Sequence, residues 1–152
     1  MKKLFAIVLT FALLASLSVT AFAANTTGGD ADITTSIAPT YTVTIPADVN
    51  VAFNATETAF GTIEVTASQI HPNKCIKVAL ATDKELNNAI DNTKVIPYAI
   101  KDSEGAEFTS ATYLTEGDKT ELSIHITADD WNAAYAGDYS DTVTFTVSYE
   151  DK

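Results

Sequence analysis

The chain contains a single cysteine, Cys75, and no arginine among its 152 residues. One cysteine excludes an intrachain disulfide, so the fold must be held by its own core rather than by cross-links. Cys75 opens the apolar stretch 75–81 and is predicted to be a small strand residue, while a free thiol and interchain pairing stay open. With 46% hydrophobic and 19% charged residues, the composition excludes a disordered chain.

Positive charge is scarce throughout the sequence. Seven lysines against twenty acidic residues give residues 24–152 a formal net charge of −13, and the remaining two lysines lie in the first 23 residues. This excess of negative charge argues against nucleic acid, anionic lipid and anionic wall polymer as partners. It is compatible with a soluble protein outside the cell.

Motifs of enzyme active sites are missing as well. The sequence has no G-x-S-x-G, no H-E-x-x-H and no phosphate-binding glycine loop. His71 precedes Pro72 in a turn and His125 falls on the polar face of a strand, so both are predicted to be surface histidines. The acidic pairs in the loops lack the spacing of a calcium-binding loop. We therefore expect no enzyme activity, no cofactor and no metal site.

The first 23 residues have the order of a secretory signal peptide. Lys2 and Lys3 precede an apolar run over residues 4–17, and the small-residue sequence Ala21-Phe22-Ala23 follows. The apolar run is shorter than the ~20 residues of a spanning helix, which disfavours a membrane anchor. We predict cleavage after Ala23, export to the cell surface or the medium, and no membrane contact after cleavage.

The remaining sequence divides into an arm and one domain. Residues 24–38 are small, polar and glycine-containing, which is typical of a flexible N-terminal arm. Residues 39–152 carry short alternating segments that end at turn residues, and they are long enough for one core. The predicted strands are residues 40–45, 49–53, 60–65, 75–81, 95–101, 106–109, 122–127 and 137–150, with residues 83–94 as a polar connection.

The last of these segments has the longest alternation. Its apolar face is formed by Tyr139, Val143, Phe145, Val147 and Tyr149, and its other face consists of hydroxyl residues. A hydroxyl face suits a solvated sheet surface or an edge that pairs with another chain. Just before it, residues 129–136 predict at most one short helical turn, capped by Asp129 and ended by Gly137.

Many short strands without a long amphipathic helix predict an all-β fold, an antiparallel β-sandwich of immunoglobulin-like or pilin-like type with seven to eight strands. Trp131 is expected to cover one end of the core. The predicted core residues are Tyr41, Val43, Ile45, Ile76, Val78, Leu80, Ile96, Leu122, Ile124, Ile126, Val143, Phe145 and Val147.

Two segments carry a resemblance to known families. Residues 136–149, with glycine, an aromatic residue, alternating Thr and Val and a late tyrosine, resemble the closing strand of bacterial fimbrial subunits and spore-coat-U-like domains. Residues 41–47, Tyr-Thr-Val-Thr-Ile-Pro-Ala, are similar to the first strand of small secreted surface domains of Gram-positive bacteria. The chain departs from these families because it has neither the pilin cysteine pair, nor an LPxTG signal, nor a Trp-x-Leu motif at Trp131.

The resemblance implies a secreted, surface-associated, non-enzymatic structural subunit, fimbria-like or coat-like. Such a subunit assembles with other subunits or with itself through β-strand edges, because backbone pairing across an open edge is a common assembly mode. The arm would then act as a strand donor with Ile33 and Ile37 as its anchors. The alternative is a monomeric extracellular adhesin or carbohydrate-binding module, in which Trp131 and Tyr135 form a sugar-stacking pair.

Overall fold

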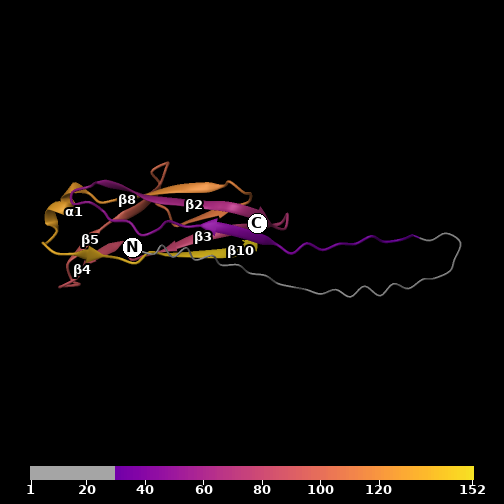
Figure 1. Ribbon diagram of the computed structural model, residues 1–152. Coiled ribbons are helices and arrows are strands. Elements are labelled where there is room, and N and C mark those ends of the chain that lie inside the picture. The colour runs from indigo at the N-terminus through magenta and orange to yellow at the C-terminus, as the bar shows by residue number, and fades with distance from the viewer. Residues whose placement is uncertain (1–29) are drawn as a thin grey trace, which may run out of the picture.

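A computed structural model describes residues 30–152, which form ten strands and one short helix (Figure 1). The predicted signal peptide and residues 24–29 of the arm lie outside the described residues. Within residues 30–152, no helix is long and apolar enough to cross a bilayer. The elements are β1 Thr40–Thr44, β2 Glu57–Gln69, β3 Lys74–Ala81, β4 Glu85–Asn88, β5 Val95–Pro97, β6 Ala99–Asp102, β7 Ser110–Tyr113, β8 Lys119–His125, α1 Ala128–Ala133, β9 Tyr139–Ser140 and β10 Thr144–Asp151.

The strands form three antiparallel sheets in a sandwich-like arrangement, which confirms the predicted all-β fold. One sheet has the order β1-β2-β8-β6, the second β10-β3-β7 and the third β5-β4-β9. Tyr41 of β1 stacks on Tyr149 of β10 with ring centroids 5.8 Å apart, so these two edge strands, from different sheets, meet across the core. The strand number exceeds the predicted seven to eight because some predicted strands are broken in two.

The core lies between the sheets and is filled mainly by Ile and Val. Alternation along β2 buries Ile63 and Val65 completely, and β3 buries Ile76 and Val78 in the same way. Of the predicted core, Ile76, Val78, Ile96, Leu122, Ile124 and Ile126 are buried, and Tyr41, Val43, Leu80, Trp131, Val143, Phe145 and Val147 pack against the core while partly exposed. The core also contains residues absent from the prediction, namely Ile63, Val65, Tyr98, Ile100, Phe108 and Tyr113.

The prediction was wrong for Ile45 and for the strand at residues 49–53. Ile45 is 47% exposed, and residues 45–56 belong to no strand. The chain leaves the sheet at Pro46, which cannot donate a ladder hydrogen bond. Pro46 packs so closely on Gly61 of β2 that a Cβ at position 61 would lie 3.1 Å from the proline Cβ. Pro46 thus packs on β2 just after β1 ends, and the following residues continue outside any strand.

Two further segments differ from the prediction. Residues 83–94 are not only a polar connection, because β4 forms there and pairs with both β5 and β9. The predicted strand 95–101 is divided at Tyr98 into β5 and β6, which pair with different sheets. The predicted strand 106–109 is reduced to one isolated bridge between Lys101 and Glu107, and β7 begins after it.

The predicted final strand, residues 137–150, is interrupted. Its first part is β9, which pairs with β4, and its second part is β10, which pairs with β3. Residues 141–143 connect them outside any strand. The helical turn occurs as α1, but its N-cap is Thr127, whose hydroxyl accepts from the Asp130 N–H at 3.1 Å, rather than Asp129. It ends at Ala133, before Gly137.

The described part of the arm, residues 30–38, is exposed and belongs to no strand or helix. Figure 1 shows it extending away from the end of the sandwich where the C-terminus lies, opposite the end that carries α1. Its two large apolar side chains are exposed, Ile33 at 99% and Ile37 at 68%. The described arm is thus a solvent-exposed segment with two large apolar side chains, attached to one end of the fold.

Candidate functional site

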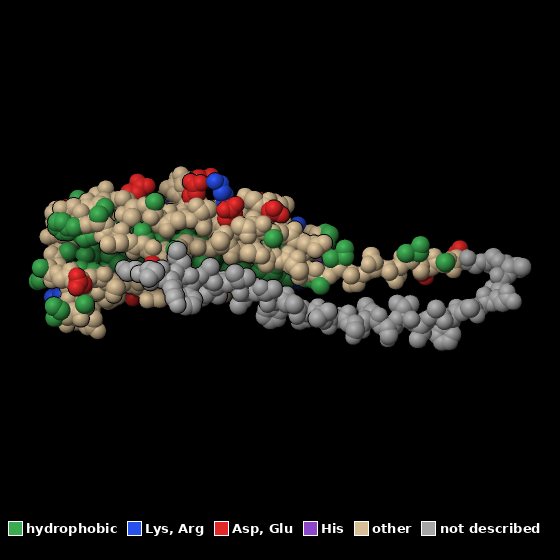
Figure 2. Space-filling view, in the orientation of Figure 1, with side chains coloured by type: hydrophobic (Ala, Val, Ile, Leu, Met, Phe, Trp, Pro, Cys, Tyr) green, Lys and Arg blue, Asp and Glu red, His purple; other side chains and the backbone are tan. Residues whose placement is uncertain are grey.

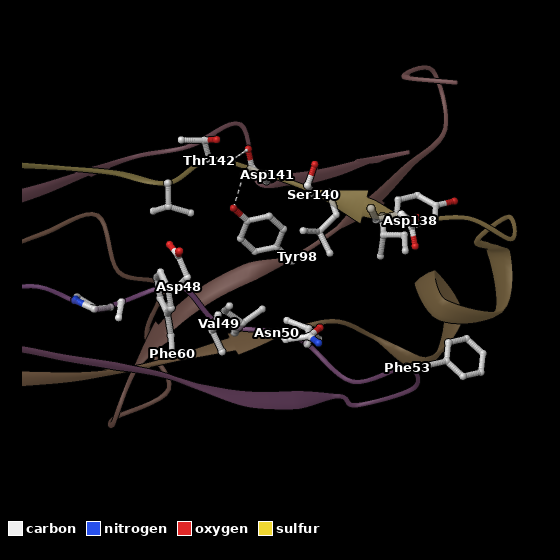
Figure 3. A pocket seen from close by; sticks show the side chains of 18 of the residues that line it. Asp48, Val49, Asn50, Phe53, Phe60, Tyr98, Asp138, Ser140, Asp141 and Thr142 are labelled. Carbon is white, nitrogen blue, oxygen red and sulfur yellow. Dashed lines mark hydrogen bonds between the residues drawn. The ribbon is translucent and has the colours of Figure 1, made fainter. Parts of the chain in front are cut away.

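A groove runs between two segments of the sandwich, the one that follows β1 and the one that includes β9 and the connection to β10. Residues 45–51 form one rim and residues 138–143 the other, and the hollow between them has a volume of about 720 Å³. Figure 3 shows Asp48, Val49 and Asn50 on one side and Asp141 and Thr142 on the other, with Tyr98 between the two rims. On the first rim, residues 45–51 form no strand, although the sequence pattern predicts one at residues 49–53. On the second rim, residues 141–143 interrupt the predicted final strand after β9.

The floor of the groove is apolar. Phe60 of β2 and Phe145 of β10 approach each other with ring centroids 5.9 Å apart, and both line the hollow. Leu86, Ile96 and Ile124 complete the floor from three other strands. Val49 and Ile45 on the first rim remain 38% and 47% exposed. An extended chain with apolar side chains on one face is therefore complementary to this surface.

The second rim is held by side-chain hydrogen bonds of Asp141. Its carboxylate accepts from the Thr82 hydroxyl at 2.8 Å and from the Tyr98 hydroxyl. Burial, together with this hydrogen bond to the carboxylate, holds the pKa of Tyr98 well above its ordinary value, so the phenol stays protonated and donates. Asp141 thus anchors residues 141–143 through its side chain. These residues connect β9, which pairs with β4, to β10, which pairs with β3.

The charges around the groove are all negative. Asp48, Asp138 and Asp141 line it, and no lysine does so among the residues that the structure describes. The described arm carries Asp30 and Asp32 as well. Binding of one chain's arm by another chain's groove would therefore work against like charges, which dissolved salt screens.

A second hollow, of about 500 Å³, lies beside the groove at the end that carries α1. The predicted pair Trp131 and Tyr135 lines it together with Phe53. The Phe53 ring meets the Trp131 ring edge to face, with centroids 5.6 Å apart and an interplanar angle of 79°. Figure 2 shows hydrophobic side chains gathered at this end. Phe53 falls at the end of the predicted strand 49–53, so the sequence pattern does not assign it to this site.

The two predicted aromatic residues have different environments. Trp131 is half-buried, and its indole N–H donates to the carbonyl of Ala55 at 2.9 Å. Tyr135 is 63% exposed, and the Lys94 ammonium lies 4.9 Å from the centroid of its ring. The structure thus brings Trp131 and Tyr135 to one hollow. The predicted arm anchors Ile33 and Ile37 project into solvent elsewhere.

The histidines do not form a catalytic triad with the groups beside them. His125 Nε2 lies 2.9 Å from the Ser123 hydroxyl and 3.9 Å from a carboxylate oxygen of Glu57. A triad places the nucleophile hydroxyl and the carboxylate on opposite nitrogens of the imidazole, whereas here both groups meet the same nitrogen. His71 is exposed in the turn before β3, where its Nδ1 accepts from Asn73 N–H at 3.4 Å.

Other groups of chemical interest are dispersed. Cys75 is buried, and its thiol lies 3.7 Å from the carbonyl of Glu150 on β10. Within residues 30–152, no three His, Cys, Asp or Glu side chains gather in a way that fits a metal ion. The groove and the aromatic hollow are therefore the two surfaces from which we argue function.

No protein-family model matches this chain, and no curated protein matches it. The resemblance of residues 41–47 and 136–149 to fimbrial and coat domains thus stays a prediction, and the function must be argued from the two surfaces.

Proposed function

We propose that this protein is a secreted, surface-associated structural subunit, fimbria-like or coat-like and non-enzymatic, that assembles through β-strand edges. In this proposal the groove of one copy accepts the arm of another copy as an additional strand. The observation that carries it is an apolar-floored groove whose rims include two segments outside any strand, residues 45–51 and residues 141–143. A strand lying between them would extend β-pairing to residues 45–51 or 141–143 and cover the floor.

The arm has the pattern that such a strand requires. Ile33 and Ile37 are four residues apart, so in an extended chain they point to the same face, about 13 Å from each other. Burying each side chain contributes roughly 1.5–3 kcal/mol, before the cost of association is subtracted. Two such anchors alone give weak binding, so most of the affinity must come from backbone hydrogen bonds along the rims.

The geometry favours an open assembly over a closed dimer. The arm leaves the end of the sandwich opposite α1 (Figure 1). The groove lies nearer the α1 end, because Trp131 of α1 is among its lining residues. A donor at one end and an acceptor toward the other form a heterologous contact, which propagates as a chain of subunits unless the rotation closes a ring. Export by the predicted signal peptide would place this chain of subunits outside the cell.

The first test compares the solution mass of a chain starting at Ala24 with that of a chain starting at Pro39, by light scattering over a concentration series. We expect oligomers that grow with concentration only when the arm is present. In the longer chain, Ile33→Ser with Ile37→Ser should reduce assembly, whereas Thr34→Ala with Ser36→Ala, on the opposite face, should not. A monomer at every concentration in both chains would overturn self-assembly through the arm.

Cross-linking identifies the acceptor. One preparation carries Ile33→Cys in the arm and another carries Val49→Cys on the rim of the groove. Native Cys75 is buried, so the introduced thiols are the accessible ones. A mixture of the two under mild oxidation should yield a disulfide dimer between the variants. Replacing Val49→Cys by Thr112→Cys, an exposed position on β7, provides the control. Equal cross-linking at both positions would show that the groove is not the acceptor.

A further inference from the structure

The aromatic hollow beside α1 is built by a tight turn that exposes an aromatic side chain. Ala55 N–H donates to the carbonyl of Ala52 at 3.0 Å, which places Phe53 and Asn54 at the tip of the turn. Asn54 has φ of 64°, in the left-handed region that asparagine tolerates better than most residues. Phe53 is 77% exposed as a result. Phe53 does not stand alone, because it lines the same hollow as Trp131 and Tyr135, and a group of exposed apolar side chains is typical of a binding surface.

Hydrogen bonds hold the other walls of the hollow in place. The indole N–H of Trp131 is fixed to the Ala55 carbonyl of the same turn, 2.9 Å away. The Tyr139 hydroxyl accepts from Tyr135 N–H at 3.1 Å and donates to the Tyr135 carbonyl at 3.0 Å. The Lys94 ammonium lies over the Tyr135 ring. The three aromatic rings are therefore positioned before any ligand arrives, which reduces the entropy lost on binding.

Exposed amide groups accompany these rings. Asn54 and Asn132 line the hollow, and both are exposed. Each amide carries a donor and an acceptor, which suits the vicinal hydroxyls of a sugar, while the C–H face of a pyranose ring packs on an aromatic ring. The volume of about 500 Å³ lies within the range of small-ligand sites, about 300–1,000 Å³.

We propose that the hollow lined by Phe53, Trp131 and Tyr135 is a binding site for a neutral oligosaccharide. A neutral sugar is favoured over an acidic one because the chain carries a net charge of −11 and its Lys94 is already engaged with Tyr135. The hollow adjoins the acceptor groove, because Phe53 and Trp131 line both, whereas Tyr135 lines the hollow and not the groove. A surface subunit with such a site would both assemble and adhere.

The test uses the intrinsic fluorescence of Trp131, the single tryptophan of the chain, during titration with cellohexaose, xylohexaose, maltohexaose and chitohexaose. At least one sugar should give a saturable change. Phe53→Ala and Tyr135→Ala should each weaken its affinity by about tenfold, as expected for aromatic contacts at a binding site. Tyr135→Phe keeps the ring and should retain affinity within about threefold. Circular dichroism checks that each variant is folded.

Two controls separate this site from the groove. Ile90→Ala removes an exposed apolar side chain that does not line the hollow and should leave sugar affinity unchanged. The chain starting at Pro39 should bind the sugar as well as the chain starting at Ala24, so sugar binding and arm-dependent assembly fail independently. No saturable change with any of the four sugars up to about 10 mM, a range that includes even weak binding, would overturn the proposal. Equal affinity in Phe53→Ala, Tyr135→Ala and the unchanged protein would overturn it too.

Discussion

Gly137 is the residue at which the groove, the aromatic hollow and the core meet. It has φ of +146°, and a Cβ at this position would lie 2.6 Å from the amide nitrogen of Asn88. Asn88 is buried, and its side-chain oxygen accepts from the backbone N–H groups of Ile90 at 2.9 Å and Asp91 at 3.2 Å. A side chain at 137 would therefore be strained and would also displace an amide that organises the β4–β5 connection.

We expect Gly137→Ala to lower the free energy of unfolding by roughly 1–3 kcal/mol, because backbone strain and steric displacement of Asn88 act together. Urea denaturation followed by circular dichroism measures this difference. Gly105→Ala is the matched control, since Gly105 has φ of +82° but no heavy atom lies within 4 Å of the added Cβ. A loss for Gly137→Ala no larger than that for Gly105→Ala would contradict the role of Asn88.

At the scale of elements, the β7–β8 connection depends on one carboxylate. Asp118 accepts from the backbone N–H groups of Leu114 at 2.7 Å and Thr115 at 2.9 Å, and from the Thr115 hydroxyl at 2.9 Å. These hydrogen bonds hold the pKa of Asp118 below its ordinary value, and the bond from the Leu114 N–H has the largest effect. The same connection is fixed to β2, because Gly117 N–H donates to the Val65 carbonyl at 2.8 Å.

This lowered pKa predicts a pH-dependent contribution to stability. Because the folded-state pKa of Asp118 is depressed, its stabilisation is present above the unfolded value of about 3.9 and is lost as pH falls through the folded value. We therefore expect Asp118→Asn to be less stable than the unchanged protein at pH 6, with a difference that shrinks below about pH 4. Thermal unfolding across this pH range measures it. A difference that stays constant with pH would exclude the charge as the cause.

At the scale of the whole molecule, charge opposes the proposed assembly. Both the arm, with Asp30 and Asp32, and the groove, with Asp48, Asp138 and Asp141, are acidic. The isoleucines of the arm and the floor of the groove are apolar, so the hydrophobic effect favours binding of the arm in the groove. Repulsion between the aspartates of the two surfaces opposes it. Added salt weakens mainly the electrostatic repulsion, so a salt series separates this repulsion from the hydrophobic contribution.

We expect assembly to increase between about 20 mM and 300 mM NaCl, over which the Debye length falls from roughly 20 Å to 6 Å. At the lower salt concentration, Asp30→Asn with Asp32→Asn should also increase assembly, as measured by light scattering. Glu104→Gln with Glu116→Gln removes the same charge from exposed turns that do not line the groove. An equal effect of the two double variants would show that net charge, and not the arm–groove contact, controls assembly.

The sequence by itself determined the all-β class and the faces of the regular strands. Alternation placed Ile76 and Val78, and likewise Leu122 and Ile124, in the core, because side-chain direction in a strand depends only on local geometry. It also selected Trp131 and Tyr135 as a pair, since both fall in the short predicted helical turn at residues 129–136. It did not include Phe53 in that pair, because in the sequence Phe53 continues an alternating strand pattern.

Only the tertiary structure decided where strands stop. Residues 49–53 and 141–143 have strand patterns, yet the structure has no strand at either. Before the first, Pro46 packs on Gly61, and in the second, Asp141 accepts hydrogen bonds from Tyr98 and Thr82. These contacts join residues distant in the sequence, and a local period of two contains no information about them. The groove and the aromatic hollow exist because of those contacts, so both sites are properties of the folded chain.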